Sequence, residues 1–298
     1  MGDKSAVERR FYDLKSGQIS ALHFGDKTRP IRLVFLHANG FNGLTYRRVF
    51  DGLSTHSVAL DLRGHGYSTL PIPEGPLYNF HIFRDDVVEF IEGYVDDPVL
   101  IVGHSLGGAV AMLANQILPH HIGAALILDP PTLPASWRII FRQPFIHRWF
   151  YEHFNLSKKA RLRQAVFSDR GSLLAHYQKK SLFRRFSPGV LGDYIEGGTR
   201  PHDDGITLCC PPDWEARIFL GHDNDLFGAA RALPKHSYYI LADDKMASSP
   251  SARFRIRRIM GRDRIETAQG SHHLFPMEHP DYVRAHIERL LKASGIDG

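Results

Sequence analysis

Short apolar runs recur along the chain and predict the strands of a central sheet. Residues 31–38 read IRLVFLHA and residues 98–104 read PVLIVGH, with few polar positions. A strand solvated on one face alternates apolar and polar side chains, so a nearly continuous apolar run indicates burial on both faces. Five further runs are predicted as strands: 19–24, 57–64, 124–129, 237–243 and 264–270.

Segments with helical spacing separate these runs. Apolar residues recur every three to four positions in 84–95 and in 106–118. A further helix is predicted over 280–294, where Pro280 opens the segment and Gly295 follows it. Alternation of strands and helices is typical of a mostly parallel sheet flanked by helices, so the predicted fold class is α/β.

The alternation stops between about Pro131 and Arg217. This stretch contains aromatic and basic residues in helical-looking segments, such as WRIIFRQPFIHRWFYEHF, and no buried-strand run. We therefore expect a helical cap at residues 132–215, inserted over the C-terminal edge of the sheet into a core made of 1–131 and 216–298. Because no polar linker joins the two parts, they are expected to pack closely.

One turn between a predicted strand and a predicted helix is unusually rich in glycine. Residues 101–108 read IVGHSLGG, which places Ser105 between glycines two positions before it and two after it. A serine in a Gly-X-Ser-X-Gly turn is lifted above the edge of the sheet, and bulky neighbours would clash there. The Leu106 amide and the start of the following helix then point at whatever the serine attacks. The alternative is a glycine-rich turn that holds an ordinary serine.

With three further motifs in order, the sequence resembles the α/β-hydrolase superfamily. FLHANGFNG at 35–43 follows a predicted strand, where the family has its oxyanion-hole loop. DLRGHGYS at 61–68 and QGSHHLFPMEHP at 269–280 resemble a family turn and the loop that carries the catalytic histidine. The resemblance covers most of the chain outside the insertion and implies an α/β-hydrolase fold. It also implies that Asp61 and Arg63 belong to a structural turn.

A serine hydroxyl needs a base to remove its proton. The resemblance implies His273 as that base, because the family has Gly three positions before the histidine, Glu five after it and Pro seven after it. Gly270, Glu278 and Pro280 satisfy this spacing for His273, whereas none of them satisfies it for His272.

The carboxylate that orients the histidine is less clear. The family often has Gly-X-X-Asp after the strand that reads SYYIL here, but Ala242 and Lys245 stand at the two defining positions. Asp244 and Asp243 are nearby and out of register. A second position used in the superfamily ends the preceding strand, where this chain has Asp129. Asp129 is the first candidate, followed by Asp244 and then Asp243.

The resemblance also implies a pair of backbone amides that stabilise an oxyanion. One is expected at Leu106. The other is expected at Phe41, and Ala38 or Asn39 are the alternatives because the loop is two residues longer than a simple His-Gly-Phe. His37, just before this loop, is expected to be structural.

Charge is unevenly distributed along the 298 residues. The whole chain carries a formal charge of +5. Between Arg138 and Arg185, twelve Lys or Arg stand against two acids, a net of +10, so the remainder carries −5. This asymmetry is compatible with an anionic partner and also with an ordinary solvated face of basic helices.

Neither the cysteines nor the apolar runs suggest a secreted or membrane-spanning protein. Cys209 and Cys210 are adjacent, which disfavours a disulfide between them, and two ligands do not make a zinc site. The charged segment 1–10 lacks the apolar region of a signal peptide, and no run approaches the roughly 20 residues of a membrane helix. We therefore expect a cytoplasmic protein without integral membrane association.

Together these features predict a carboxylesterase-like serine hydrolase that cleaves an ester-like acyl bond of a small, apolar substrate. No metal or other cofactor is required, and no nucleic-acid partner is expected. A lactonase or a carbon–carbon bond hydrolase on the same scaffold is an alternative. Another is a non-catalytic binding protein whose basic insertion engages an anionic ligand, because a fold does not dictate a function. The aromatic side chains of the predicted cap can line a substrate pocket or pack the cap onto the sheet.

Overall fold

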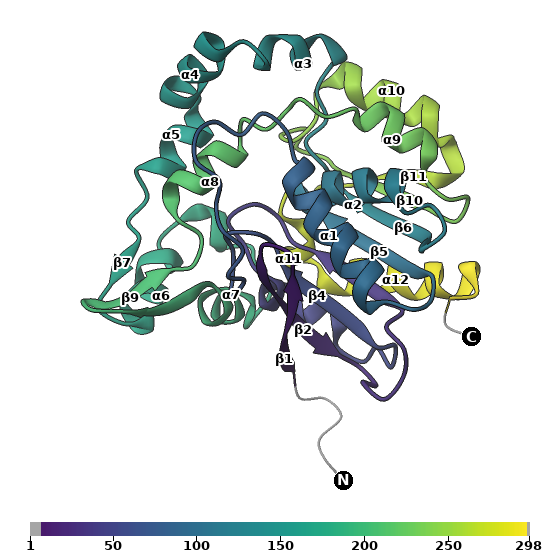
Figure 1. Ribbon diagram of the computed structural model, residues 1–298, viewed down its shortest axis with the longest axis horizontal. Helices are drawn as coiled ribbons and strands as arrows, with labels where there is room; N and C mark the ends of the chain where they lie inside the picture. Colours follow the sequence, from purple (N-terminus) through teal and green to yellow (C-terminus); the bar gives the residue numbers. More distant parts are fainter. Residues whose placement is uncertain (1–6, 297–298) are drawn as a thin grey trace.

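The computed structural model describes residues 7–296 and is built on an eight-stranded sheet of order β1-β2-β4-β3-β5-β6-β10-β11 (Figure 1). The six strands from β4 to β11 run parallel, whereas β1 and β2 are antiparallel to their neighbours. Seven of the eight strands were predicted. The bounds are β1 Glu8–Leu14, β2 Gly17–Phe24, β3 Leu33–Leu36, β4 Ser57–Asp61, β5 Val99–His104, β6 Ile122–Leu128, β10 Tyr238–Ala242 and β11 Ile265–Ala268.

The strand β1 was missed because it has no buried apolar run. It reads ERRFYDL, and only its last residue, Leu14, is buried. It forms the edge of the sheet and pairs with β2 alone, from Glu8 opposite His23 to Leu14 opposite Gly17. A half-exposed edge strand of this kind carries little of the signal that identifies central strands.

Both faces of the sheet are buried under helices. Along β3, Val34 and Leu36 enter one core, and Leu33 and Phe35 enter the other, as the two-residue period of a strand requires. Helices α1, α2, α9 and α10 cover the first face, and η1, α11 and α12 cover the second. Their bounds are α1 His81–Tyr94, α2 Leu106–Ile117, α9 Leu226–Ala232, α10 Pro250–Met260, η1 Gly43–Phe50, α11 Phe275–Glu278 and α12 Pro280–Ser294.

Most of the chain between β6 and β10 forms a separate layer beside the sheet (Figure 1). It contains six α-helices and a short 3-10 helix: α3 Ala135–Phe141, α4 Pro144–His153, α5 Asn155–Arg161, α6 Arg170–Gln178, η2 Ser181–Phe183, α7 Val190–Gly198 and α8 Pro212–Ile218. The predicted boundary between 215 and 216 falls inside α8. We keep the name cap for residues 132–215.

The prediction of a purely helical cap is wrong in one respect. Three short antiparallel strands, in the order β7-β9-β8, form a second sheet there: Val166–Phe167, Gly205–Leu208 and Thr199–His202. They are two to four residues long with one buried residue each, so they lack the apolar run used to identify strands. Their inner residues join helices α6 and α7 in a small core of the cap's own. Within residues 7–296, no helix is long and apolar enough to cross a bilayer.

Candidate active site

Ser105 lies in the sharp turn between β5 and α2 and has a strained backbone. Its φ is 54°, a region that non-glycine residues seldom occupy. A Cβ at Gly103 would lie 2.2 Å from the Gly107 carbonyl oxygen, and a Cβ at Gly107 would lie 2.1 Å from the Leu36 carbonyl oxygen. Only glycine fits at both positions, which explains the composition of the turn. The Ser105 side chain remains partly exposed.

A line of hydrogen bonds connects Ser105 to a buried carboxylate. His273 Nε2 lies 2.9 Å from Ser105 Oγ, and His273 Nδ1 lies 2.7 Å from Asp129 Oδ2. Because a carboxylate can only accept, these partners assign the proton to Nδ1 and leave Nε2 to accept from the serine hydroxyl. Asp129 follows β6, is fully buried, and also faces Arg253, whose Nη2 is 3.6 Å from Oδ1. Sequence reasoning missed Arg253, one of four arginines on α10, because it lies outside every motif.

The other two candidate acids contact the backbone of the histidine loop instead of the imidazole. Asp244 Oδ2 accepts from the His273 amide at 2.8 Å, and Asp243 Oδ2 accepts from the Gly270 amide at 3.1 Å. Neither carboxylate is hydrogen-bonded to the His273 ring. The structure thus places both residues where they hold the loop, and only Asp129 where it can orient the imidazole.

The loop after β3 differs from the prediction for the oxyanion hole. The Phe41 amide already donates to the Ala38 carbonyl at 3.1 Å, so it is not free to bind an oxyanion. The amides of Ala38 and Gly40 donate to side chains at 3.1 and 3.0 Å. By contrast, the amides of Asn39 and Leu106 have no hydrogen-bond acceptor among residues 7–296. Of the three amides considered from the sequence, those of Phe41, Ala38 and Asn39, only that of Asn39 is therefore without an acceptor.

A buried polar relay links this loop to the backbone of His273. The Tyr46 hydroxyl accepts from the Ala38 amide at 3.1 Å and donates to His104 Nδ1 at 2.7 Å. His104 Nε2 in turn donates to the His273 carbonyl at 2.8 Å. Burial holds the pKa of His104 well below its usual value, so this ring is neutral. Tyr46 belongs to no motif, and nothing in the sequence singled it out.

His37 holds the same loop through the two nitrogens of its ring. Its Nδ1 donates to the Ala38 carbonyl at 2.8 Å, and its Nε2 accepts from the Leu62 amide at 2.9 Å. Burial lowers the pKa of His37 to about 4, which keeps the ring neutral and able to accept. The contacts are those of a structural residue, as expected.

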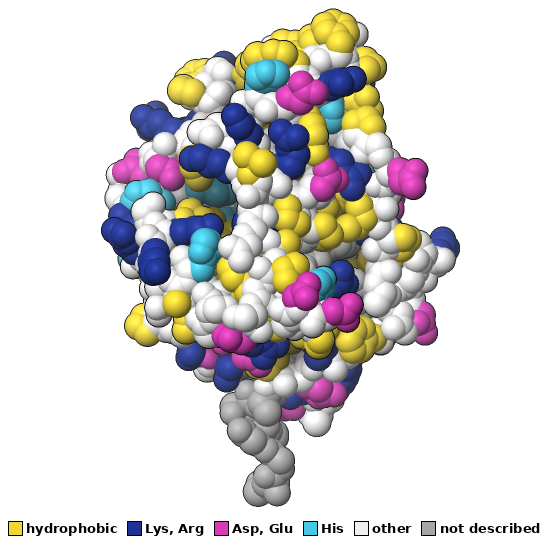
Figure 2. All heavy atoms as spheres, turned by 90° about the vertical axis from the view of Figure 1, so that its left-hand side faces the viewer, with side chains coloured by type: hydrophobic (Ala, Val, Ile, Leu, Met, Phe, Trp, Pro, Cys, Tyr) yellow, Lys and Arg dark blue, Asp and Glu magenta, His cyan; other side chains and the backbone are white. Residues whose placement is uncertain are grey.

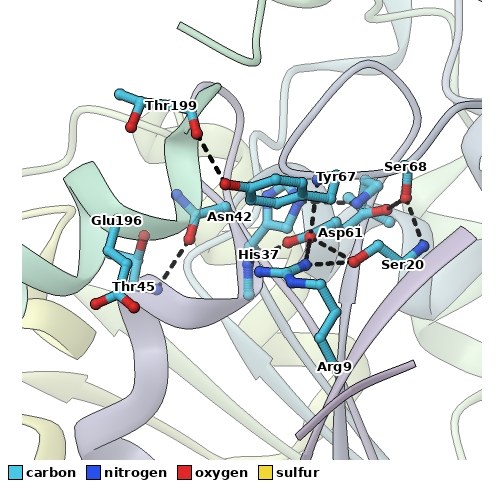
Figure 3. Close-up of polar contacts among 12 residues, drawn as sticks. Arg9, Ser20, His37, Asn42, Thr45, Asp61, Tyr67, Ser68, Glu196 and Thr199 are labelled. Atoms are coloured by element: carbon cyan, nitrogen blue, oxygen red, sulfur yellow. Dashed lines mark hydrogen bonds and ion pairs between the residues drawn. The ribbon is translucent and has the colours of Figure 1, made fainter. Parts of the chain in front are cut away.

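Asp61 has its side chain fully occupied by structural contacts (Figure 3). Its carboxylate accepts from Ser20 Oγ at 2.9 Å, from the Gly43 amide at 2.9 Å and from the Tyr67 amide at 3.1 Å, and it pairs with Arg9. These bonds join β1, β2, the start of η1 and the turn after β4. The structural role expected for Asp61 agrees with this geometry.

The cap contacts the loop after β3 directly. Asn42 Nδ2 donates to the Tyr194 carbonyl at 3.0 Å, and the Tyr67 hydroxyl donates to the Thr199 carbonyl at 3.0 Å, as Figure 3 shows for Tyr67. The rings of Phe41 and Tyr194 are 5.2 Å apart. Aromatic side chains of the cap thus stand beside the loop that neighbours Ser105.

The described residues offer no evident site for a metal ion. No group of three or more His, Cys, Asp or Glu within 7–296 is arranged to hold one. Cys209 and Cys210 are buried free thiols, and burial raises the pKa of both, to about 11 for Cys209.

Comparison with known sequences gives one family and several distant relatives. A model described as "Alpha/beta hydrolase family" matches residues 33–286. An esterase of Mycobacterium tuberculosis, Rv0045c, is 30% identical over 128 residues, which cover 43% of this chain and 40% of the relative. Human monoglyceride lipase is 32% identical over 115 residues, or 35% of this chain and 36% of the relative. The matched segments thus span well under half the length of these curated relatives.

Solved structures match over nearly the whole chain. E-2-(acetamidomethylene)succinate hydrolase superimposes with a TM-score of 0.79 at 18% identity, covering 96% of this chain and 100% of the other. A thioesterase domain from the curacin biosynthetic pathway gives 0.72 at 18% identity, covering 95% and 100%. At such identities the likeness is one of fold.

Proposed function

We propose that this chain, which belongs to the alpha/beta hydrolase family, is a serine hydrolase that cleaves ester-like acyl bonds through an acyl-enzyme. The observation that carries the proposal is the line of hydrogen bonds from Ser105 through His273 to Asp129, at 2.9 and 2.7 Å. Nucleophile, base and orienting acid within hydrogen-bond reach form the arrangement that activates a serine.

In the proposed reaction, Ser105 Oγ attacks the carbonyl carbon of the substrate while His273 Nε2 accepts the hydroxyl proton. The imidazolium that forms lies against the buried carboxylate of Asp129, which stabilises its charge. His273 then returns the proton to the leaving alkoxide as the tetrahedral intermediate collapses to the acyl-enzyme. Water, deprotonated by the same histidine, attacks the acyl carbon and releases the acid.

We further propose that the amides of Leu106 and Asn39 bind the oxyanion. Both lack an acceptor among residues 7–296, whereas Phe41, the residue expected from the sequence, is engaged. Leu106 begins α2, so the positive end of the helix dipole adds to the field at this point. Losing one such donor typically costs ~3 kcal/mol of transition-state stabilisation.

The proposed substrate is a small ester with an apolar acyl part. The relatives that match by sequence include proteins named as an esterase, lipases and methylesterases, and one named as a probable alcohol acetyltransferase; these names support ester chemistry for this chain too. The aromatic residues of the cap beside the oxyanion loop, Tyr194 and Phe186 around Phe41, favour an apolar group.

Labelling with a fluorophosphonate tests the proposal. We expect stoichiometric labelling of the wild-type chain and none of Ser105→Ala or His273→Ala. His272→Ala is the matched control, because the adjacent ring has no contact with Ser105 and should label normally. Hydrolysis of p-nitrophenyl esters of increasing acyl length then measures how long an acyl chain the substrate pocket accepts. Labelling that survives in Ser105→Ala, or that falls equally in both histidine variants, would refute the assignment.

A further inference from the structure

Helix α4 carries aromatic side chains on both of its faces. On the inner face, Phe150 packs against Phe141 with ring centres 5.0 Å apart, and the imidazole of His147 lies 3.1 Å from the Leu77 carbonyl through Nε2. A surface helix normally has one apolar face, turned to the core, and a polar outer face. The inner face of α4 is therefore the one that packs against the rest of the fold.

The outer face of α4 exposes large apolar side chains. Phe145 and Trp149 are 72% and 55% exposed and, four positions apart, lie on the same side of the helix. Ile139 on α3 is 67% exposed, and Leu162 just after α5 is 70% exposed. Of the eleven exposed large hydrophobic residues described, five fall within 139–162, so the exposure is concentrated here. We call the three that lie on α3 and α4, namely Ile139, Phe145 and Trp149, the cap-tip surface.

Figure 1 places α3 and α4 at the top of the molecule, and Figure 2 shows hydrophobic side chains gathered at this end beside several basic ones. Lys158, Lys159 and Arg161 on α5 are exposed and have no carboxylate partner among residues 7–296. Glu152, the only acid between 138 and 163, pairs with Arg148 at 3.2 Å. Positive charge without counter-charge thus lies close in sequence to the apolar residues.

We propose that the cap-tip surface docks on an anionic lipid bilayer, with Phe145 and Trp149 at the level of the headgroups. An apolar face with tryptophan and phenylalanine, flanked by basic residues, is the composition of helices that lie in the membrane interface. Exposed apolar patches on otherwise polar proteins mark such interaction sites. The docking is peripheral, since no described helix can span the bilayer.

Charge and polarity argue against a second copy of the chain and against a nucleic acid as the partner of the cap-tip surface. In a symmetric contact with a second copy, the unpaired cations of both copies would face one another. A nucleic acid would satisfy Lys158 and Lys159 but leave the aromatic side chains in water. An anionic bilayer satisfies both, because its headgroups carry the negative charge and its acyl boundary accepts the apolar groups. The proposal does not depend on whether Ser105 is catalytic.

Vesicle binding by the full chain tests the inference. We expect co-sedimentation with vesicles of phosphatidylcholine containing phosphatidylglycerol, little with phosphatidylcholine alone, and weakening by salt. Trp149 fluorescence should shift to the blue on binding, and Trp149→Phe should remove the shift. Phe145→Ser with Trp149→Ser should lower affinity about tenfold or more, and each of Lys158→Gln and Lys159→Gln about fivefold.

Matched controls lie outside the cap residues 132–215. Phe254 on α10 is 64% exposed, so Phe254→Ser removes an exposed aromatic of comparable size, and Lys235→Gln removes an exposed lysine. Both should leave vesicle binding unchanged. Absence of binding at low salt, or binding unaffected by the Phe145 and Trp149 changes, would overturn the proposal. So would self-association that these changes abolish, seen by sedimentation velocity. Vesicle binding with no fluorophosphonate labelling would reject the proposed hydrolase and leave the docking intact.

Discussion

Replacing Asp129 by asparagine tests the assignment of the orienting acid most directly. The carboxylate accepts from His273 Nδ1 at 2.7 Å and is fully buried, so no water can take its place. An asparagine amide nitrogen at this position would donate toward Nδ1 and favour the opposite tautomer. Nε2 would then carry the proton and could no longer accept one from Ser105.

The expected size of this effect follows from the chemistry of the pair. Holding a triad histidine in the wrong tautomer lowers kcat by about 10⁴, or roughly 5 kcal/mol of barrier. Stability is a separate quantity, because the change also removes the charge that faces Arg253 at 3.6 Å. A thermal melt of the Asp129→Asn variant is therefore measured beside kcat, so that a folding defect is not counted as a catalytic one.

The matched control is Asp244→Asn. Asp244 accepts from the His273 amide at 2.8 Å, and an asparagine oxygen can still accept that bond. We expect kcat on a p-nitrophenyl ester to fall less than about tenfold, the loss of charge assistance in one hydrogen bond. The reasoning fails if Asp129→Asn keeps a tenth of the activity, or if the two variants lose equal amounts.

Three further predictions concern groups around the site and buried histidines elsewhere in the fold. Tyr46→Phe removes the hydroxyl that links the Ala38 amide to His104. It should lower the free energy of unfolding, measured in urea, by about 1–3 kcal/mol and kcat/KM by about tenfold. Unchanged values would mean that these hydrogen bonds contribute to neither stability nor activity. Gly40→Ala places a Cβ 2.7 Å from Glu215 Oε1 at a φ of +77°, whereas Gly75→Ala has the same strain at φ +76° and open space, so only the first should abolish activity. Burial lowers the pKa of several histidines in the fold and brings that of His37 to about 4. The unfolded chain therefore binds more protons below pH 6.5, and stability should fall between pH 6.5 and 4 by about 1.4 kcal/mol per unit for each such ring; a flat pH profile of melting temperature would contradict this. The same cause lowers the pKa of His23 and His65 to about 3 and that of His222 to about 4.

The central strands and the glycine-rich turn that holds Ser105 were predictable because their sequence signals are local. A strand buried on both faces must be apolar throughout, and a strained turn against a neighbouring backbone must be glycine, as at Gly103 and Gly107. The spacing of Gly, Glu and Pro that the family has around its catalytic histidine likewise favoured His273 over His272. The edge strand β1 and the three strands of the cap carry no such signal, because each of them has only one buried residue.

The sequence by itself determined the fold class, the position of Ser105 in its glycine-rich turn, and the loop at 269–280 that carries His273. The choice among Asp129, Asp243 and Asp244 belonged to the tertiary structure. All three follow sheet strands in the right chain order, and only the path of the histidine loop decides which of them meets the ring and which meet its backbone. The proposal of the Asn39 amide in place of the Phe41 amide as an oxyanion donor has the same origin. An amide is available or engaged according to the turn its loop adopts, and every residue except proline carries the same amide.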